Sequence, residues 1–148
     1  MPLTLSIVTA QRTVLERGDV TKLVVPASEG QITILPSHAA LMTALGSGEM
    51  LATHPGGAEP IAIHGGFLQI VDDEVSVLAD AAEHVLQIDL ERAEAARARA
   101  EARLTGRDTG IPPGGLDVLR AQAALQRSII RIAIVRRRRA TGVPSSRP

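Results

Sequence analysis

The sequence predicts an α+β protein, in which a β-sandwich is followed by a hairpin of two α-helices. Short runs of alternating Val, Ile, Leu and Thr fill the first 84 residues, whereas Ala, Arg and Glu dominate after Gln87. The charge changes at the same place, since residues 1–84 have three basic and ten acidic side chains, and residues 85–148 have 13 arginines and six acids. These changes predict a body (1–84), an arm (85–140) and a disordered tail (141–148).

The body contains five segments that alternate apolar and polar residues with the period of a β-strand. They are residues 3–9, 21–27, 31–35, 66–71 and 74–78. Gly, Pro, Asp and Ser predict turns between strands at residues 16–19, 28–30, 55–57 and 72–73. Short strands with such turns are typical of a sandwich or flattened barrel, and no helical pattern that would suit a parallel α/β sheet separates them.

The arm is predicted to hold two helices. The first begins after Asp89, a suitable N-cap, has Glu91 in its first turn and is expected to end at Gly106. The Gly- and Pro-rich residues 109–115 predict a loop. The second helix is expected over residues 116–138, including the Ile-rich segment 128–135, because the flanking residues favour a helix.

The apolar stripe of the first helix is narrow and made mostly of alanine. Its members are Leu90, Ala93, Ala96, Ala100 and Leu104. Each buried CH₂ contributes only about 0.8 kcal/mol, so an alanine face holds a partner weakly. We therefore expect a marginal, detachable hairpin and a hinge between it and the body.

The chain lacks the residues that several classes of enzyme require. It has no cysteine and one aromatic residue, Phe67, which excludes thiolate chemistry and leaves little for base stacking. No nucleotide-binding glycine loop, zinc-protease or serine-hydrolase motif is present. We interpret the scattered His38, His54, His64 and His84 as turn or surface residues. Without a signal-peptide pattern or a membrane-spanning apolar run, we expect a soluble, cytosol-facing protein that is not an enzyme.

The arginines of the arm leave two readings open. Arg92, Arg99 and Arg103 share a helix face, Arg127 and Arg131 are four residues apart, and an antiparallel hairpin could bring them together as a phosphate site. The alternative is ordinary surface ion pairing. The basic run 135–139 suits either a helix C-terminus or an acidic or nucleic-acid partner, so the runner-up function is an Arg-rich nucleic-acid-binding module on a β-sandwich.

Four stretches in this order resemble the epsilon subunit of the bacterial F-type rotary ATP synthase. They are "EGQITILPSHAALMTALGSGEM" (29–50), "IHGGFLQIVDDEVSVLADAAE" (63–83), "IDLERA" (88–93) and "ALQRSIIRI" (124–132). The resemblance implies a ten-stranded β-sandwich and a C-terminal helical hairpin. It also implies a non-catalytic part of the central stalk that couples proton transport to ATP synthesis.

The same resemblance implies the partners. The sandwich would dock on the gamma subunit and the c-subunit ring, and the arm would extend towards the alpha/beta hexamer and block ATP hydrolysis. The subunit would lie on the cytoplasmic face of the bacterial membrane, which it would meet only through the complex. No nucleic acid, metal or required cofactor is implied.

Site residues also follow from the resemblance, and none of them is catalytic. In some bacterial members the folded arm binds ATP as a regulatory ligand. The matching positions here are Glu83, Ile88, Asp89, Arg92, Ala93, Arg99, Arg127 and Arg131. The expected rotor contacts are Glu29, Gln31 and His38.

Overall fold

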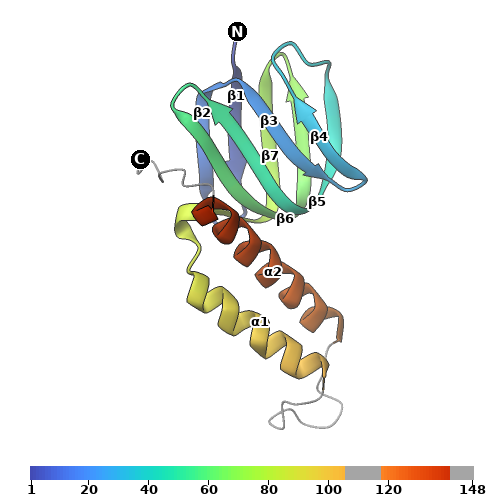
Figure 1. Ribbon diagram of the computed structural model, residues 1–148. Helices are drawn as coiled ribbons and strands as arrows, with labels where there is room; N and C mark the ends of the chain where they lie inside the picture. The colour runs from blue at the N-terminus through green and yellow to red at the C-terminus, as the bar shows by residue number, and fades with distance from the viewer. Residues whose placement is uncertain (106–117, 141–148) are drawn as a thin grey trace. The chain divides into compact units, whose positions relative to one another are not determined.

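A computed structural model describes residues 1–105 and 118–140, with side chains up to Arg137. The chain divides into two compact units that meet between Gln87 and Ile88 (Figure 1). The expected helix stop at Gly106, the loop at 109–115 and the tail at 141–148 lie outside the described residues.

The first unit is a sheet of seven strands that folds into two layers (Figure 1). The strands are β1 (Leu3–Val8), β2 (Thr13–Val20), β3 (Lys22–Ala27), β4 (Gly30–Ile34), β5 (Leu41–His54), β6 (Gly57–Val71) and β7 (Glu74–His84). Their order is β2-β1-β7-β6-β5-β3-β4, and all neighbours are antiparallel except β1 and β7. A 3₁₀ helix, η1 (Val85–Gln87), ends the unit. The predicted class, a sandwich followed by a helical hairpin, is confirmed.

The strand number is seven rather than ten because the central strands are long. The pairing of β5, β6 and β7 is interrupted at Gly46, Gly65 and Asp80. Counting each of these three strands as two would raise the number from seven to ten. β5 was not predicted from the sequence, because the glycines inside it conceal its alternation.

The core lies between the two layers. It consists of alternate residues of the strands, including Leu5, Ile7, Leu23, Ile63 and Leu68, each at most 1% exposed. Such alternation buries one side of each strand and leaves the other side for solvent or partners.

Three of the predicted turns are confirmed and one is wrong. Residues 28–29, 55–56 and 72–73 form turns, and Asp72 and Asp73 both have positive φ, as a two-residue hairpin requires. Residues 16–19 lie instead inside β2. The register with β1 shifts by one residue there, so Gly18 accompanies a bulge rather than a chain reversal.

The second unit contains helices α1 (Leu90–Leu104) and α2 (Val118–Ala140), which pack side by side (Figure 1). Asp89 is the N-cap of α1, as predicted, and its carboxylate accepts a 3.2 Å hydrogen bond from the Arg92 N–H. Segment 128–135 is helical, which confirms its assignment despite its β-propensity. Ala93 and Ala100 are the buried residues of α1, so its buried face is indeed made of alanine.

Candidate functional site

One outward face of the sandwich carries a row of apolar side chains. Phe67 on β6 pairs with Leu78 on β7 and with Ala44 on β5, and Leu78 pairs with Val8 on β1. Paired residues point to the same side of a sheet, so these four side chains form a row across four strands. Phe67 is 59% exposed and Leu78 is 65% exposed.

The row continues along β5. Met42 is two residues from Ala44, so it points to the same side, and it is 68% exposed. We call Val8, Met42, Ala44, Phe67 and Leu78 the apolar face. Single exposed apolar residues are common on proteins, but a continuous set on neighbouring strands marks an interaction site.

The structure places two of the expected rotor contacts beside the apolar face. Glu29 lies in the β3–β4 turn and Gln31 follows on β4, and both are exposed. The Ser28 N–H in this turn donates a 3.0 Å hydrogen bond to the carbonyl oxygen of Ala44, an apolar-face residue. The turn therefore lies at the edge of the apolar face.

His38 lies elsewhere, at the opposite end of β4 from the turn. A strand rises about 3.3 Å per residue, so Gln31 and Leu35 are separated by about 13 Å. The segment of His38 is held beside the β6–β7 turn, where the Ser37 N–H donates to Asp73 Oδ1 at 2.6 Å. His38 itself is half-buried.

The positions of the hairpin arginines along the helix axis can be compared through the register of the two helices. Arg136 of α2 forms a 2.9 Å ion pair with Glu94 of α1, so these two positions are level. Counting five residues along each helix in opposite directions puts Arg99 level with Arg131. By this count Arg99 and Arg131, two arginines of the predicted phosphate site, lie at about the same height along the hairpin axis.

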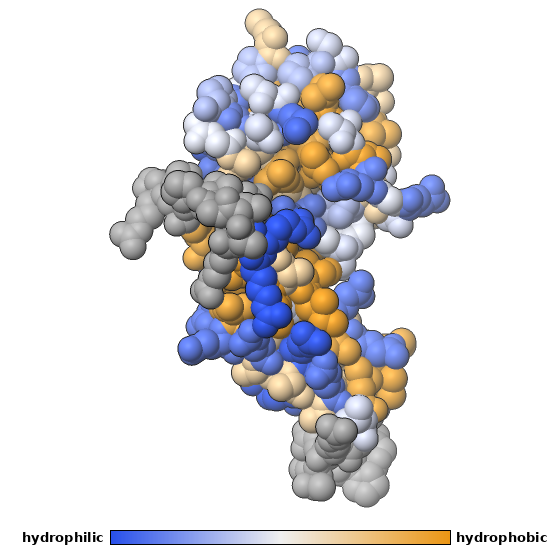
Figure 2. All heavy atoms as spheres, viewed as in Figure 1, coloured by the Kyte–Doolittle hydropathy of each residue, from blue (hydrophilic) through white to orange (hydrophobic). Residues whose placement is uncertain are grey.

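The remaining arginines of that site are spread along the hairpin. By the same register Arg127 is level with Arg103, eleven residues from Arg92, or about 16 Å along the helix axis. Arg92 and Arg99 are exposed, whereas Arg127 and Arg131 are half-buried. Figure 2 shows hydrophilic side chains beside hydrophobic ones on the visible face of the hairpin.

The other expected ATP positions have varied surroundings. Asp89 is exposed and occupied as the N-cap, Ile88 is half-buried, and Ala93 is buried in α1. Glu83 is half-buried on β7 and belongs to the first unit.

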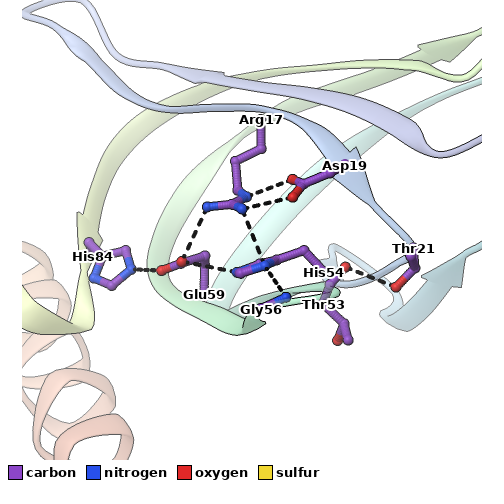
Figure 3. A network of polar contacts seen from close by, with 8 residues as sticks. All are labelled: Arg17, Asp19, Thr21, Thr53, His54, Gly56, Glu59 and His84. Atoms are coloured by element: carbon purple, nitrogen blue, oxygen red, sulfur yellow. Dashed lines mark hydrogen bonds and ion pairs between the residues drawn. The ribbon is translucent and has the colours of Figure 1, made fainter. Parts of the chain in front are cut away.

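A polar network that the sequence analysis missed lies near the end of β7 (Figure 3). His54 Nε2 lies 3.1 Å from Glu59 Oε1, and His84 Nε2 lies 2.5 Å from Glu59 Oε2. Arg17 makes two hydrogen bonds to Asp19, of 2.8 and 2.9 Å, and approaches Glu59 Oε1 at 3.6 Å. The interpretation of His54 and His64 as turn or surface residues was wrong, because both are buried in strands, at 8% and 7% exposure.

Hydrogen-bond donors determine the protonation of both rings. His54 Nδ1 faces the Gly56 N–H at 3.1 Å and Arg17 Nη2 at 3.2 Å, which can only donate. His84 Nδ1 likewise faces the Leu86 N–H at 3.1 Å. Each Nδ1 must therefore be a bare acceptor, so in this arrangement both imidazoles are neutral and donate from Nε2 to Glu59.

The carboxylates of the network are stabilised in their charged form. Burial raises the pKa of Glu59. The hydrogen bonds from His84 and His54, and the positive charge of these rings when they are protonated, lower the pKa by more, so it lies below the ordinary 4.5. The hydrogen bonds from Arg17 likewise lower the pKa of Asp19. The network thus ties β2, β5, β6 and β7 together through charge-assisted hydrogen bonds.

The described part of the chain offers neither a metal cluster nor a membrane-spanning helix. Within residues 1–105 and 118–140, no cluster of three or more His, Asp or Glu side chains is arranged to hold a metal ion. Among the helices that the structure describes, none is long and apolar enough to cross a membrane.

Comparison with known proteins assigns both units. The family model "ATP synthase, Delta/Epsilon chain, beta-sandwich domain" matches residues 2–85. The model "ATP synthase, Delta/Epsilon chain, long alpha-helix domain" matches residues 87–136. Together they cover a sandwich and a hairpin in the order that the structure has.

Relatives and solved structures agree with these matches. The ATP synthase epsilon chain of Desulfitobacterium hafniense (strain DSM 10664 / DCB-2) is 41% identical over 130 residues, 84% of this chain and 94% of the relative. That of Herpetosiphon aurantiacus is 40% identical over 139 residues, 94% and 98% of the two chains. A chain of the Euglena gracilis mitochondrial ATP synthase (OSCP/F1/c-ring) has the same fold, with a TM-score of 0.73 and 20% identity over 90% of this chain and 81% of that one.

The two family models and the epsilon-chain relatives together identify a non-catalytic subunit of ATP synthase. The chain belongs to the delta/epsilon chain family of ATP synthase. The curated relatives named above are epsilon chains, so the family supersedes the nucleic-acid-binding module as the account of this protein.

Proposed function

We propose that the sandwich docks on the gamma subunit through its apolar face and meets the c-subunit ring through the turn that carries Glu29 and Gln31. The observation that carries this proposal is the exposed pair Phe67 and Leu78 at the centre of a row across four strands. Covering these side chains would remove apolar surface from water, which is the main driving force for stable association. His38, at the other end of β4, would make a separate contact.

The hairpin would regulate the assembly. Its buried α1 residues are alanines, so opening the helix pair exposes little apolar area on α1. Folded and extended states that differ by only a few kcal/mol can be shifted by ligands or partners. We propose that the extended arm reaches the alpha/beta hexamer and inhibits ATP hydrolysis, while the sandwich remains on the rotor that couples proton transport to ATP synthesis.

ATP is the ligand that we propose for the folded hairpin. Arg99 and Arg131 are level, and Arg127 is one turn from Arg131, so a triphosphate between the helices would meet several guanidinium groups. Arg92 lies further along the axis, nearer the N-cap Asp89, where it suits the nucleoside end. Bound phosphates would offset the repulsion among these arginines and favour the folded hairpin.

Co-purification with the gamma subunit of the same complex tests the docking proposal. Phe67→Ser and Leu78→Ser change exposed side chains, so the sandwich should keep its fold while gamma binding weakens at least tenfold. Pro55→Ser is the matched control, since it also replaces an exposed apolar residue, in the β5–β6 turn. Equal binding by all three variants would exclude the apolar face as the docking surface. We also propose that the subunit lies on the cytoplasmic face of the bacterial membrane, as part of the complex. Recovery of the assembly with bacterial membranes, its F1 side towards the cytoplasm, would test this location.

A further inference from the structure

The last three residues of the first unit, η1, are held by hydrogen bonds to their neighbours. The Leu86 N–H donates to His84 Nδ1 at 3.1 Å. Gln87 Oε1 accepts from Arg12 Nη2 at 2.9 Å and from the His84 N–H at 3.4 Å. The next residue, Ile88, begins the second unit, so these contacts fix the last residues of the sandwich unit.

The contact between Leu86 and His84 exists only while the imidazole is neutral. His84 Nε2 carries a proton that points to Glu59, so Nδ1 is the nitrogen that a second proton must occupy. Protonated Nδ1 is a donor, and it would then face the N–H of Leu86, which is also a donor. Uptake of one proton therefore removes the hydrogen bond that holds η1 to the end of β7.

Charged and titratable groups face His84 from the neighbouring strands. The Glu59 carboxylate on β6 lies directly against the ring and attracts a positive charge. Beyond it are His54 on β5 and Arg17 and Asp19 on β2, of which Arg17 and Asp19 largely offset each other. Glu83 precedes His84 on β7 and points to the other side of the strand, and Arg12 faces Gln87 rather than the ring.

His54 is the less suitable proton acceptor, although it shares the same carboxylate. Its Nδ1 faces the charged guanidinium of Arg17 as well as the Gly56 N–H, and its side chain is 5% exposed. His84 Nδ1 faces a single neutral N–H, and its side chain is 14% exposed. A second proton on His54 would meet a fixed positive charge, whereas on His84 it would meet only a peptide dipole.

We propose that His84 is a proton-sensitive contact at the end of the sandwich: its protonation releases the Leu86 amide and loosens η1, so η1 is held less firmly on β7 in acid than at neutral pH. Histidine side chains ordinarily change charge between pH 5 and 8, the range in which such a contact responds. The inference goes beyond the proposed function and does not require the hairpin to bind ATP or inhibit hydrolysis.

Amide hydrogen exchange of the full chain, followed by NMR between pH 7.5 and 5.5, tests the proposal. After correction for intrinsic exchange, the protection factor of the Leu86 amide should fall about fivefold towards pH 5.5, the factor expected for one hydrogen bond. His84→Asn keeps an acceptor for the Leu86 N–H but has no titrating group. The Leu86 protection factor of this variant should therefore be the same at pH 7.5 and pH 5.5. His38→Asn makes the same replacement at another histidine, so it should show the same fall in Leu86 protection as the wild type.

Glu59→Gln supplies an independent check, since the carboxylate that attracts the proton becomes neutral. The fall in Leu86 protection should then occur at lower pH than in the wild type. A constant protection factor in the wild type would overturn the proposal, as would a step that persists in His84→Asn or is unmoved in Glu59→Gln.

Discussion

Gly66 approaches the backbone of Leu78 so closely that a Cβ added to the glycine would lie 2.1 Å from the Leu78 carbonyl oxygen. The φ angle of Gly66 is also positive, at 122°. β6 and β7 can therefore pair here only if the residue has no side chain.

Replacement of Gly66 by Ala should lower the free energy of unfolding by more than about 2 kcal/mol, because the clash is with backbone that cannot move aside. Urea denaturation measures the change. Gly18→Ala is the matched control, since a Cβ there would meet nothing within 4 Å. Similar losses in the two variants would contradict the close approach.

Replacement of Asp89 by Ala should destabilise the hairpin by about 1 kcal/mol, because the Arg92 N–H loses its acceptor. Asn at this position is an equally good N-cap and should restore nearly all of the stability. Helical circular dichroism during thermal unfolding would measure both variants. An Ala variant as stable as the wild type would show that the cap contributes nothing.

Glu59 should make the stability of the sandwich depend on pH. Its pKa is lower in the folded protein than the ordinary 4.5, so it stabilises the fold above that pH, and this contribution is lost as pH falls through the folded pKa. Urea midpoints between pH 7 and pH 3 should therefore decline less steeply in Glu59→Gln than in the wild type. Parallel declines would assign the acid sensitivity to other carboxylates.

Calorimetric titration of the full chain with ATP should show binding that weakens at least severalfold in Arg92→Ala, Arg99→Ala or Arg127→Ala, because each removes a positive charge from the hairpin. Arg97→Ala is the control, since Arg97 is exposed and pairs with Glu101 at 3.0 Å. Removal of residues 85–148 should abolish binding and relieve inhibition of ATP hydrolysis in the complex. If millimolar ATP gives no heat of binding, the hairpin does not bind ATP, and the arginines are better explained by contacts with the alpha/beta hexamer.

The features predicted correctly from the sequence depend on neighbours along the chain. Asp89 as a cap, the reversal at Asp72 and Asp73, and the helix over residues 128–135 are set by interactions within a few residues. The period of the apolar residues likewise indicated a sandwich followed by a hairpin. Local propensity and periodicity were sufficient for these because the interacting groups are close in sequence.

Tertiary structure alone decided what depends on strand pairing and helix register. The residues 16–19 have the composition of a turn, yet pairing with β1 holds them in a strand with a bulge. His84 and Glu59 are 25 residues apart, and no spacing rule in the sequence brings both to one end of the sheet. The equal height of Arg99 and Arg131 along the hairpin likewise depends on how the two helices pack. Sequence patterns indicate which side of an element is buried, but the element packed beside it is selected by the free energy of the whole fold.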